Sequence, residues 1–130
     1  MSSIFSKIVK GEIPCHRIDE TEDFLAFLDV NPLIEGHTLV IPKKEIDYIF
    51  NIEDSLLSGM MVFAKKVAKA VEAATDCKRI GVAVIGLEVP HAHIHLIPIN
   101  GVGDINFSKP KLKFTQEELA DTAERIKNKL

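Results

Sequence analysis

The segment PHAHIHLIPI, residues 90–99, constrains the fold more than any other part of the chain. It holds three of the five histidines at strict two-residue spacing, with apolar residues between and after them. Successive side chains of a β-strand point to opposite faces, so we expect His91, His93 and His95 on one face and the apolar residues on the other. The segment therefore predicts a strand that packs its apolar face on a core and presents a row of imidazoles on its opposite face.

Four further segments have the alternation or the short apolar runs of strands. They are HRIDET (16–21), DFLAFLDV (23–30), HTLVIP (37–42) and RIGVAVIG (79–86). Turn-length connections between such segments are typical of antiparallel pairing. The unbroken apolar run at 37–42 predicts a central strand that is covered on both faces.

Three segments have helical features. Ser3 can cap a short helix at the N-terminus. From Asp54, its expected cap, to Thr75 the apolar residues form one helical stripe, and residues 115–130 begin with a capping-box pattern. The order of these elements predicts an α+β fold: a five-stranded antiparallel sheet with a short N-terminal helix, one long helix and a C-terminal helix.

Length, charge and cysteine content limit the possible functions. A chain of 130 residues can form one domain, and we expect a single domain over 1–130, with its core at 4–106 and a helical tail at 115–130. A net charge of -3 argues against a protein that wraps nucleic acid. No apolar run is long enough for a membrane span or a signal peptide, and Cys15 and Cys77 form no paired motif, so we expect a cytoplasmic protein with reduced thiols.

The histidine row suits two kinds of chemistry. Histidines at this spacing can bind zinc, but a zinc site needs a third or fourth ligand, and no neighbouring carboxylate repeats at metal-ligand spacing. Alternatively, the middle imidazole is a nucleophile, and its neighbours hold it and bind the charged group that is transferred. A strand that is merely polar on one face does not need histidine at three positions. The spacing alone does not decide between zinc and nucleophile.

HAHIHLI matches the pattern His-x-His-x-His followed by apolar residues, and it resembles the signature of the histidine triad (HIT) family of nucleotide hydrolases and transferases. IFSKIVKGEIP, FLAFLDVNP and GHTLVIPKK are similar to other signature blocks of that family and follow the family's order. The resemblance covers roughly residues 4–106. It implies the HIT-like fold and, as is usual in the family, a homodimer.

The resemblance also implies a mechanism. His93 would attack the α-phosphorus of a nucleoside phosphoramidate, acyl-adenylate or dinucleotide, and water would hydrolyse the nucleotidyl-histidine intermediate. The backbone carbonyl of His91 would orient the ring of His93, and His95 and His37 would line the same site. This mechanism needs neither a cofactor nor a catalytic metal. The partner that the resemblance implies for the site is a small-molecule nucleotide.

A nucleotide-binding set follows from the same resemblance. Asp29 matches the acidic residue that binds the ribose hydroxyls, although a turn-forming aspartate is an alternative interpretation. The segment before the histidines, which contacts the phosphate in many members, contributes Glu88 and Val89. The positions that match the apolar cleft for the base are Phe5, Ile8, Phe27, Leu28 and Val30, which would otherwise be assigned to the core.

Two stretches depart from the family pattern. GLEVP has Leu87 at the usual Gln position and Glu88 beside it, and neither side chain, with the glutamate ionised, can donate a hydrogen bond to phosphate. SIFS has Ser3 and Ser6 where some bacterial members hold a structural zinc through CxxC, and hydroxyls are poor zinc ligands. We therefore expect a divergent substrate and no structural metal.

The expected function is a HIT-type hydrolase that cleaves a substituent from the 5′ α-phosphate of a purine nucleoside monophosphate. An alternative is a nucleotide-binding or regulatory interaction module with weak or vestigial catalysis, suggested by Leu87 and by the absence of a phosphate-facing Asn at 79–86. A third hypothesis, a zinc-dependent hydrolase, is disfavoured by SIFS. The apolar face of the helix at 54–75 can serve both the core and a homodimer.

Overall fold

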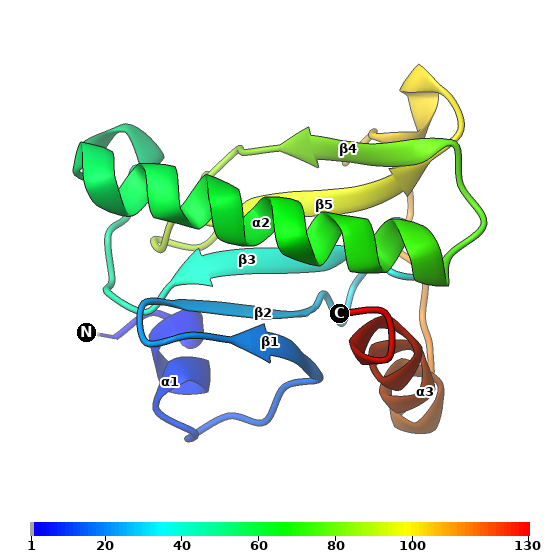
Figure 1. The fold of residues 1–130 in the computed structure, drawn as a ribbon, viewed down its shortest axis with the longest axis horizontal. Helices are drawn as coiled ribbons and strands as arrows, with labels where there is room; N and C mark the ends of the chain where they lie inside the picture. Colours follow the sequence, from blue (N-terminus) through cyan, green and yellow to red (C-terminus); the bar gives the residue numbers. More distant parts are fainter. Residues whose placement is uncertain (1) are drawn as a thin grey trace.

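The computed structural model describes residues 2–130, which are built on a five-stranded antiparallel sheet (Figure 1). In spatial order its strands are β1 (Arg17–Glu20), β2 (Phe24–Leu28), β3 (Thr38–Pro42), β5 (Ile94–Ile99) and β4 (Arg79–Ala83). Each strand lies inside the segment predicted for it, and β3 is central and wholly buried, as its apolar run indicates. The α+β fold expected from the sequence is confirmed.

Within the described residues, helices complete the fold. They are α1 (Ile4–Val9), α2 (Asp54–Ala74) and α3 (Gln116–Lys127), with short 3-10 helices η1 (Ile49–Asn51) and η2 (Val102–Asp104). The hydroxyl of Ser3 caps α1 by accepting a hydrogen bond from a backbone N–H, and Thr115 and Glu118 form the predicted capping box of α3. The cap of α2 is Glu53, so the prediction of Asp54 was wrong by one residue. Asp54 instead begins the helix, where a carboxylate is favoured by the helix dipole.

One face of the sheet is closed by α2 and α3 (Figure 1). Phe24, Ala26 and Leu28 of β2 point to this face and pack in a core cluster with buried residues of both helices. Ile94 and Leu96 of β5 join the same cluster, as the two-residue alternation predicts. The apolar stripe of α2 is thus used for the core of the chain.

The opposite face is covered only in part, by α1. The residues that pack there in a second cluster are Phe5, Leu25, Phe27, Leu39 and Ile41. Because α1 has six residues, it is about 9 Å long at 1.5 Å per residue and cannot cover the whole face. The part of this face beside α1 stays open to a ligand.

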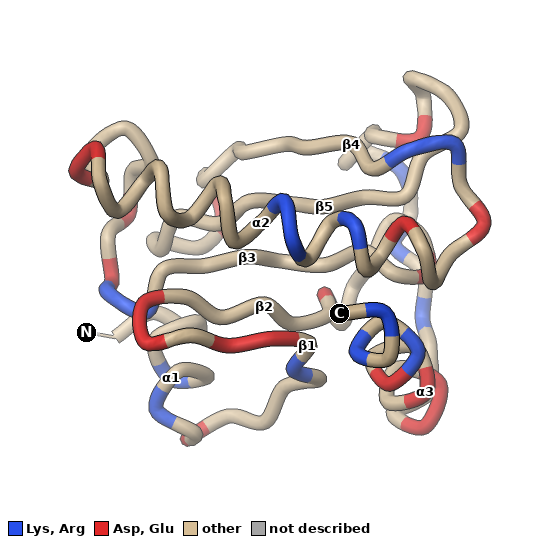
Figure 2. The backbone as a smooth tube through the Cα atoms, viewed as in Figure 1, with Lys and Arg blue, Asp and Glu red and all other residues tan. Residues whose placement is uncertain are grey.

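Charged residues of both signs are spread over the surface (Figure 2). The turn after β1 continues the acidic character of that strand, whereas α3 carries both acidic and basic residues. Along the backbone of the described residues in Figure 2, Lys and Arg positions are interspersed with Asp and Glu positions and form no single basic stripe of the kind that binds nucleic acid. No helix in residues 2–130 has the length and apolar character needed to cross a bilayer.

Candidate active site

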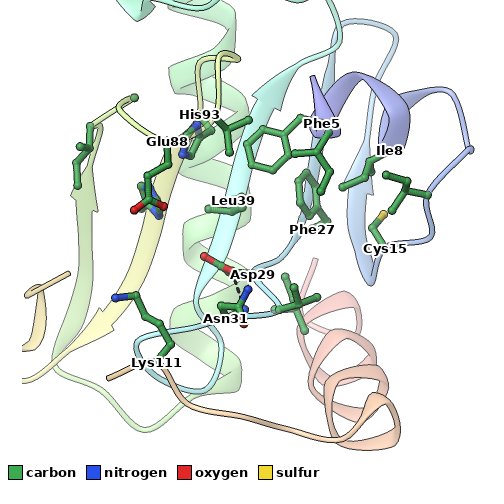
Figure 3. Close-up of a pocket in the computed structure, with 18 of the residues that line it drawn as sticks. Phe5, Ile8, Cys15, Phe27, Asp29, Asn31, Leu39, Glu88, His93 and Lys111 are labelled. Carbon is green, nitrogen blue, oxygen red and sulfur yellow. Dashed lines mark hydrogen bonds between the residues drawn. The ribbon is translucent and has the colours of Figure 1, made fainter. Parts of the chain in front are cut away.

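A cavity of about 420 Å³ opens on the face of the sheet that α1 covers in part. It is lined by every residue predicted for the site except His37 and His91. In Figure 3 an apolar side includes Phe5, Ile8, Cys15 and Phe27, a polar side includes Glu88, His93 and Lys111, and Asp29 and Asn31 lie between the two. The volume and this division suit a small ligand with one apolar part and one charged part.

The register of three strands builds the floor of the cavity. Leu39 of β3 pairs with Phe27 of β2 on one side and with His95 of β5 on the other. Directly paired residues point to the same face, so an aromatic ring, a leucine and an imidazole form one row across the sheet. This row joins the apolar side of the cavity to the histidine side.

His93 stands in the cavity wall with the orientation of its ring fixed. Its Nδ1 lies 2.8 Å from the carbonyl oxygen of His91, and because a carbonyl can only accept, Nδ1 carries the proton. In the neutral ring, Nε2 therefore holds the lone pair that can attack an electrophile. The ring of Phe5 packs against it in edge-to-face geometry, with 5.0 Å between the centroids.

His37 and His95 form a second, directional hydrogen-bond chain. The backbone N–H of Leu33 donates to Nδ1 of His37 at 3.0 Å, so Nε2 of neutral His37 carries the proton and donates to Nδ1 of His95 at 2.9 Å. Nε2 of His95 is left as an N–H donor, and the rings of His95 and His93 are 4.8 Å apart between centroids. A donor beside a candidate nucleophile is suited to an anionic group.

Burial keeps both imidazoles of this chain neutral. Desolvation lowers the pKa of His37 from its ordinary value of 6.5 to about 3, and the charge of His95 contributes further. Desolvation also lowers the pKa of His95 from 6.5 to about 4, and His93 adds to the shift. Both rings are therefore uncharged at neutral pH. The hydrogen bonds from Leu33 to His37 and from His37 to His95 keep the directions given above at this pH.

The turn before β3 fixes the place of His37. Gly36 has a φ of +94°, in the region that favours glycine, and a Cβ at this position would lie 2.8 Å from Cγ2 of Thr75. The backbone N–H of Asp29 donates to the carbonyl of His37 at 3.0 Å, which ties the end of β2 to this turn. These constraints place His37 next to Asp29, which lines the cavity.

Asp29 uses one carboxylate oxygen in a turn and presents the other to the cavity. Its Oδ1 accepts a hydrogen bond from the N–H of Asn31 at 2.9 Å, which is the turn-forming interpretation considered from the sequence. Its Oδ2 lies 3.7 Å from Nε2 of His37, too far for a hydrogen bond. Burial raises the pKa of Asp29, and the Asn31 N–H opposes that shift. The turn role and a ligand-binding role are therefore compatible.

His91 does not share the surface of the other two histidines, which corrects the expectation of a single imidazole row. β5 begins at Ile94, so His91 precedes the strand and does not follow its alternation. Its ring is fully buried: Nε2 donates to the carbonyl of Pro42 at 2.7 Å, and Nδ1 lies 2.9 Å from the hydroxyl of Ser3. His91 reaches the site only through its backbone carbonyl, which accepts from His93.

Asp29, His37 and His95 lie close together in the manner of a metal site, since one ligand atom of each lies within 4.8 Å of the others. Their hydrogen bonds do not fit a metal. A ligand nitrogen must offer a lone pair, whereas Nε2 of His37 carries a proton that it donates to His95. His37 and His95 are a hydrogen-bonded pair as they stand, and the carboxylate of Asp29 lies beside them.

The two serines in place of a CxxC pair have other partners. The hydroxyl of Ser3 contacts Nδ1 of His91 at 2.9 Å, and the hydroxyl of Ser6 donates to Oε1 of Glu45 at 2.6 Å. The polar groups that would face a zinc ion here bond to one another, and hydroxyls bind zinc poorly beside thiolates. These side chains therefore do not fit a structural zinc.

Several residues of the cavity were not predicted from the sequence. They are Ile4, Ile13, Pro14, Cys15, Asn31, Leu39, Ile85, Gly86, Phe107 and Lys111. The alternation of β3 could have placed Leu39, because it pairs with Phe27, which was predicted for the site. Phe107 comes from a segment without periodicity, and its ring packs on His95 with 4.8 Å between the centroids. No local pattern in the sequence signals that contact.

The segment before the histidines forms a mixed edge of the cavity. Glu88 and Val89 line it, whereas the side chain of Leu87 is 88% exposed at the rim. An ionised Glu88 would repel a phosphate at close range but attract a cationic leaving group. The departure from the family pattern at these positions therefore affects the entrance of the cavity.

Comparison with known proteins agrees with this geometry. Residues 10–101 match the HIT domain family. An adenosine 5′-monophosphoramidase of Schizosaccharomyces pombe is 36% identical over 133 residues, which cover 100% of this chain and 99% of the relative. A HIT-like protein of Bartonella henselae superimposes with a TM-score of 0.87 at 31% identity, covering 99% of this chain and 96% of its own. A zinc-bound histidine triad family protein of Mycobacterium smegmatis superimposes with a TM-score of 0.81 at 27% identity, covering 99% and 93%.

Proposed function

The chain belongs to the HIT domain family, and from this premise we propose that it is a hydrolase that removes a substituent from the 5′ α-phosphate of a purine nucleoside monophosphate. The phosphoramidase among its relatives supports a phosphorus–nitrogen bond as the bond that is cleaved. The observation that carries the proposal is the 2.8 Å hydrogen bond from Nδ1 of His93 to the carbonyl of His91, because it leaves Nε2 of His93 as a nucleophile at the cavity.

The proposed reaction is two displacements at phosphorus. Nε2 of His93 attacks the α-phosphorus, a nitrogen–phosphorus bond forms, and the bond to the leaving amine breaks as the amine takes up a proton from solvent. A water molecule then forms a phosphorus–oxygen bond and gives up a proton to solvent, the nucleotidyl-histidine bond breaks, and the nucleoside monophosphate leaves a neutral imidazole behind. Two easier steps replace one direct displacement at a charged phosphorus.

The neighbouring groups have separate tasks in this proposal. The N–H at Nε2 of His95 donates to a phosphate oxygen, where negative charge grows in the transition state. Oδ2 of Asp29 accepts from the ribose hydroxyls, and Asp29 lies between the two sides of the cavity in Figure 3, as a ribose lies between base and phosphate. The residues proposed to receive the base are Phe5, Ile8, Phe27, Leu28 and Val30, which line the cavity.

The His93→Ala variant tests the proposal with adenosine 5′-phosphoramidate as substrate. It should lose turnover and the nucleotidyl adduct that mass spectrometry detects in wild-type protein denatured during turnover. Its affinity for AMP should change less than a few-fold, because the new bond forms only along the reaction path. His16→Ala is the matched control, since it removes an imidazole that bonds Gln116 outside the cavity. Full activity of His93→Ala would overturn the proposal, and slow wild-type turnover without an adduct would indicate direct attack by water.

A nucleotide-binding or regulatory module with weak catalysis is the second candidate. It is favoured by Leu87, which is exposed and cannot hydrogen-bond a phosphate, and by the carboxylate of Glu88 at the cavity. Tight binding of AMP by a wild-type protein that turns over no faster than His93→Ala would select this function.

We also propose a homodimer that forms through β4 and the outer face of α2. β4 is an edge strand of the sheet, and the backbone groups of an edge can pair with a second copy. Val62 on α2 and Val82 on β4 are 70% and 52% exposed, so this side of the molecule presents apolar surface that a second copy would bury. The cytoplasmic location stays a prediction, which cell fractionation tests.

Sedimentation velocity tests the dimer. Wild-type protein should sediment with the mass of a dimer, and Val62→Glu combined with Val82→Glu should sediment as a monomer, because unpaired charges are costly to bury. Leu130→Glu is the control, since it places the same charge on an exposed residue beyond the end of α3. A wild-type monomer, or a double variant that stays dimeric, would contradict this interface.

A further inference from the structure

A group of hydrogen-bonded side chains, of which three are buried and Glu45 is exposed, lies at the N-terminal end of α1. Its members are Ser3, Ser6, Glu45 and His91. Oε1 of Glu45 accepts from the backbone N–H of Ser3 and from the hydroxyl of Ser6, both at 2.6 Å. The hydroxyl of Ser3 lies 2.9 Å from Nδ1 of His91. The loop after β3, the start of α1 and the segment before β5 therefore meet in one network.

Donors and acceptors fix the direction of every bond in this network. Nε2 of His91 lies 2.7 Å from the carbonyl oxygen of Pro42, which can only accept, so Nε2 carries the proton and Nδ1 is an acceptor. The hydroxyl of Ser3 must therefore donate to Nδ1. The hydroxyl of Ser6 donates its one hydrogen bond to the carboxylate of Glu45. It therefore cannot also donate to His91, although its oxygen lies 3.4 Å from Nδ1 of that ring.

Glu45 acts in this network as a permanent acceptor. The backbone N–H of Ser3, followed by the hydroxyl of Ser6, lowers the pKa of Glu45 from 4.5 to about 2. The carboxylate is therefore ionised at any pH near neutrality, and hydrogen bonds to an ionised acceptor are shorter and stronger than neutral ones. One oxygen of Glu45 holds both serines in place.

The carbonyl that orients His93 is not held by the sheet. The pairing of β5 with β3 begins at Ile94, opposite Val40, so the carbonyl of His91 lies outside the ladder. The peptide group of this carbonyl makes one backbone hydrogen bond, from the N–H of Ala92 to the carbonyl of Ile46 at 2.7 Å, and Ile46 follows Glu45 in the same loop. The side chain of His91 supplies the other contacts that hold the residue. The buried ring of His91 is bonded at both nitrogens, and it packs against Phe5 with 5.9 Å between the centroids. A ring bonded at both nitrogens cannot turn without breaking a bond, so the residue and its carbonyl keep one direction.

We propose that Ser3, Ser6 and Glu45 are positioning residues for the nucleophile: they hold the ring of His91, and the carbonyl of His91 holds the ring of His93. The inference rests on the proposed function, in which His93 attacks phosphorus. None of the three is among the described residues that line the cavity, so their effect on the reaction passes through His91 and not through contact with substrate.

Kinetics of variants at position 45 provide the first test. Glu45→Ala should lower kcat about tenfold and change KM less than twofold, because a lost orienting contact misplaces the reacting nitrogen without removing a binding group. Glu45→Gln should restore most of kcat, since an amide oxygen can accept both hydrogen bonds. Asp47→Ala, which removes an exposed carboxylate from the same loop, should keep the wild-type kcat.

Ser6→Ala provides an independent variant in case Glu45→Ala does not fold. It removes one bond to Glu45 but leaves the cap of α1, because the backbone N–H of Ser6 still donates to the hydroxyl of Ser3. A smaller loss of kcat, about threefold, is expected with the same unchanged KM.

A measurement without substrate completes the test. Two-bond ¹H–¹⁵N correlations of histidine rings report which nitrogen carries the proton, and wild-type protein should show His93 protonated at Nδ1 and His91 at Nε2. Glu45→Ala and Ser6→Ala should shift His93 toward a mixture of both tautomers, whereas Asp47→Ala should leave it unchanged. This readout is independent of turnover.

The outcomes separate the network from the proposed function. Unchanged tautomers and unchanged kcat in Glu45→Ala and Ser6→Ala would overturn the positioning role. A lower kcat that Glu45→Gln does not restore, with the His93 tautomer unchanged, would leave Glu45 only a structural role and would also overturn it. If the tautomers change as expected in the variants but the wild-type protein does not turn over phosphoramidate, the proposed hydrolase is refuted and the network is established.

Discussion

At the residue scale, the two oxygens of Asp29 can be separated by substitution. Oδ1 holds the turn through the N–H of Asn31, whereas Oδ2 faces the cavity near His37. Asp29→Asn keeps an oxygen for the turn and replaces the other oxygen with an NH₂ group, which cannot accept from a ribose hydroxyl. Asp29→Ala removes both interactions. The pair of variants therefore distinguishes the turn from the ligand.

Asp29→Asn should weaken the binding of AMP about tenfold or more, because hydrogen bonds to a charged group contribute roughly 1.5–3 kcal/mol. The affinity for 2′,3′-dideoxy-AMP should stay within twofold, since that ligand lacks the hydroxyls. Titration calorimetry measures both ligands. Asp29→Ala should give the same ligand pattern with an added loss of thermal stability from the turn. Equal losses of affinity for both ligands would assign Asp29 to the turn alone.

Part of the lining of the cavity was predictable from single residues, and the proton arrangement of its histidines was not. Strand alternation assigns His93 and His95 to one face, and the family pattern adds Asp29 at the end of the neighbouring strand. The proton positions depend instead on the N–H of Leu33, in the turn before β3, and on the carbonyl of Pro42, at the end of β3 and far from His91 in the sequence. Such contacts arise only when the chain is folded.

At the element scale, the segment between β5 and α3 closes part of the cavity. The ring of Phe107 packs on His95 and His37, with centroid distances of 4.8 and 6.3 Å. Nζ of Lys111 donates to the carbonyl of Phe107 at 2.6 Å and lies 5.9 Å from the centroid of its ring. This segment shields the histidine pair from water, and desolvation is the main cause of the low pKa of each.

Phe107→Ala should raise the pKa of His95 from about 4 by roughly one unit or more toward the ordinary value of 6.5, because water gains access to the ring. NMR titration of the labelled imidazole measures this directly. Val102→Ala is the matched control, since that side chain belongs to the same connection and is exposed. A pKa of His95 that is equal in all three proteins would show that the sheet alone dehydrates the ring.

The elements themselves were largely predictable because periodicity is local. β2 and α2 follow the predicted alternation and apolar stripe, and only their ends differ by one or two residues. The start of β5 at Ile94 was not predictable from alternation, which continues through His91 although the pairing does not. The position of Phe107 was not predictable either. Its segment has no periodicity, so its conformation depends on the folded surface that it packs against.

At the scale of the whole molecule, the two faces of the sheet are closed unequally. Two longer helices close one face, whereas the six-residue α1 leaves a cavity on the other. His37 and His95 beside this cavity are nonetheless buried, and so is the ring of His91 between Ser3 and Pro42. The fold therefore holds titratable groups where charging them is costly, and its stability depends on pH.

The direction of this pH dependence of stability follows from the lowered pKa values of the buried histidines. Desolvation lowers the pKa of His37 to about 3 and of His95 to about 4, and it also lowers the pKa of His91. These rings titrate near 6.5 in the unfolded chain, so from about pH 6.5 down to pH 4 the unfolded chain binds more protons than the native one. Stability contributed by the neutral rings is complete above pH 6.5 and is lost as the pH falls. The raised pKa of Asp29 acts in the opposite direction, in a lower pH range.

The expected loss of stability can be measured at pH 5. This pH lies about 1.5 units below the unfolded pKa, so His37 and His95 each cost about 2 kcal/mol of stability relative to neutral pH. A combined loss of about 4 kcal/mol should lower the thermal midpoint by on the order of 10 °C between pH 7.5 and pH 5. His37→Gln, which cannot titrate, should show a smaller fall in calorimetric scans, because the share of His37 is removed, and His16→Gln is the control for the loss of an imidazole that bonds Gln116 in an exposed contact. An equal fall in His37→Gln and wild-type protein would mean that the ring of His37 is already hydrated in the native state.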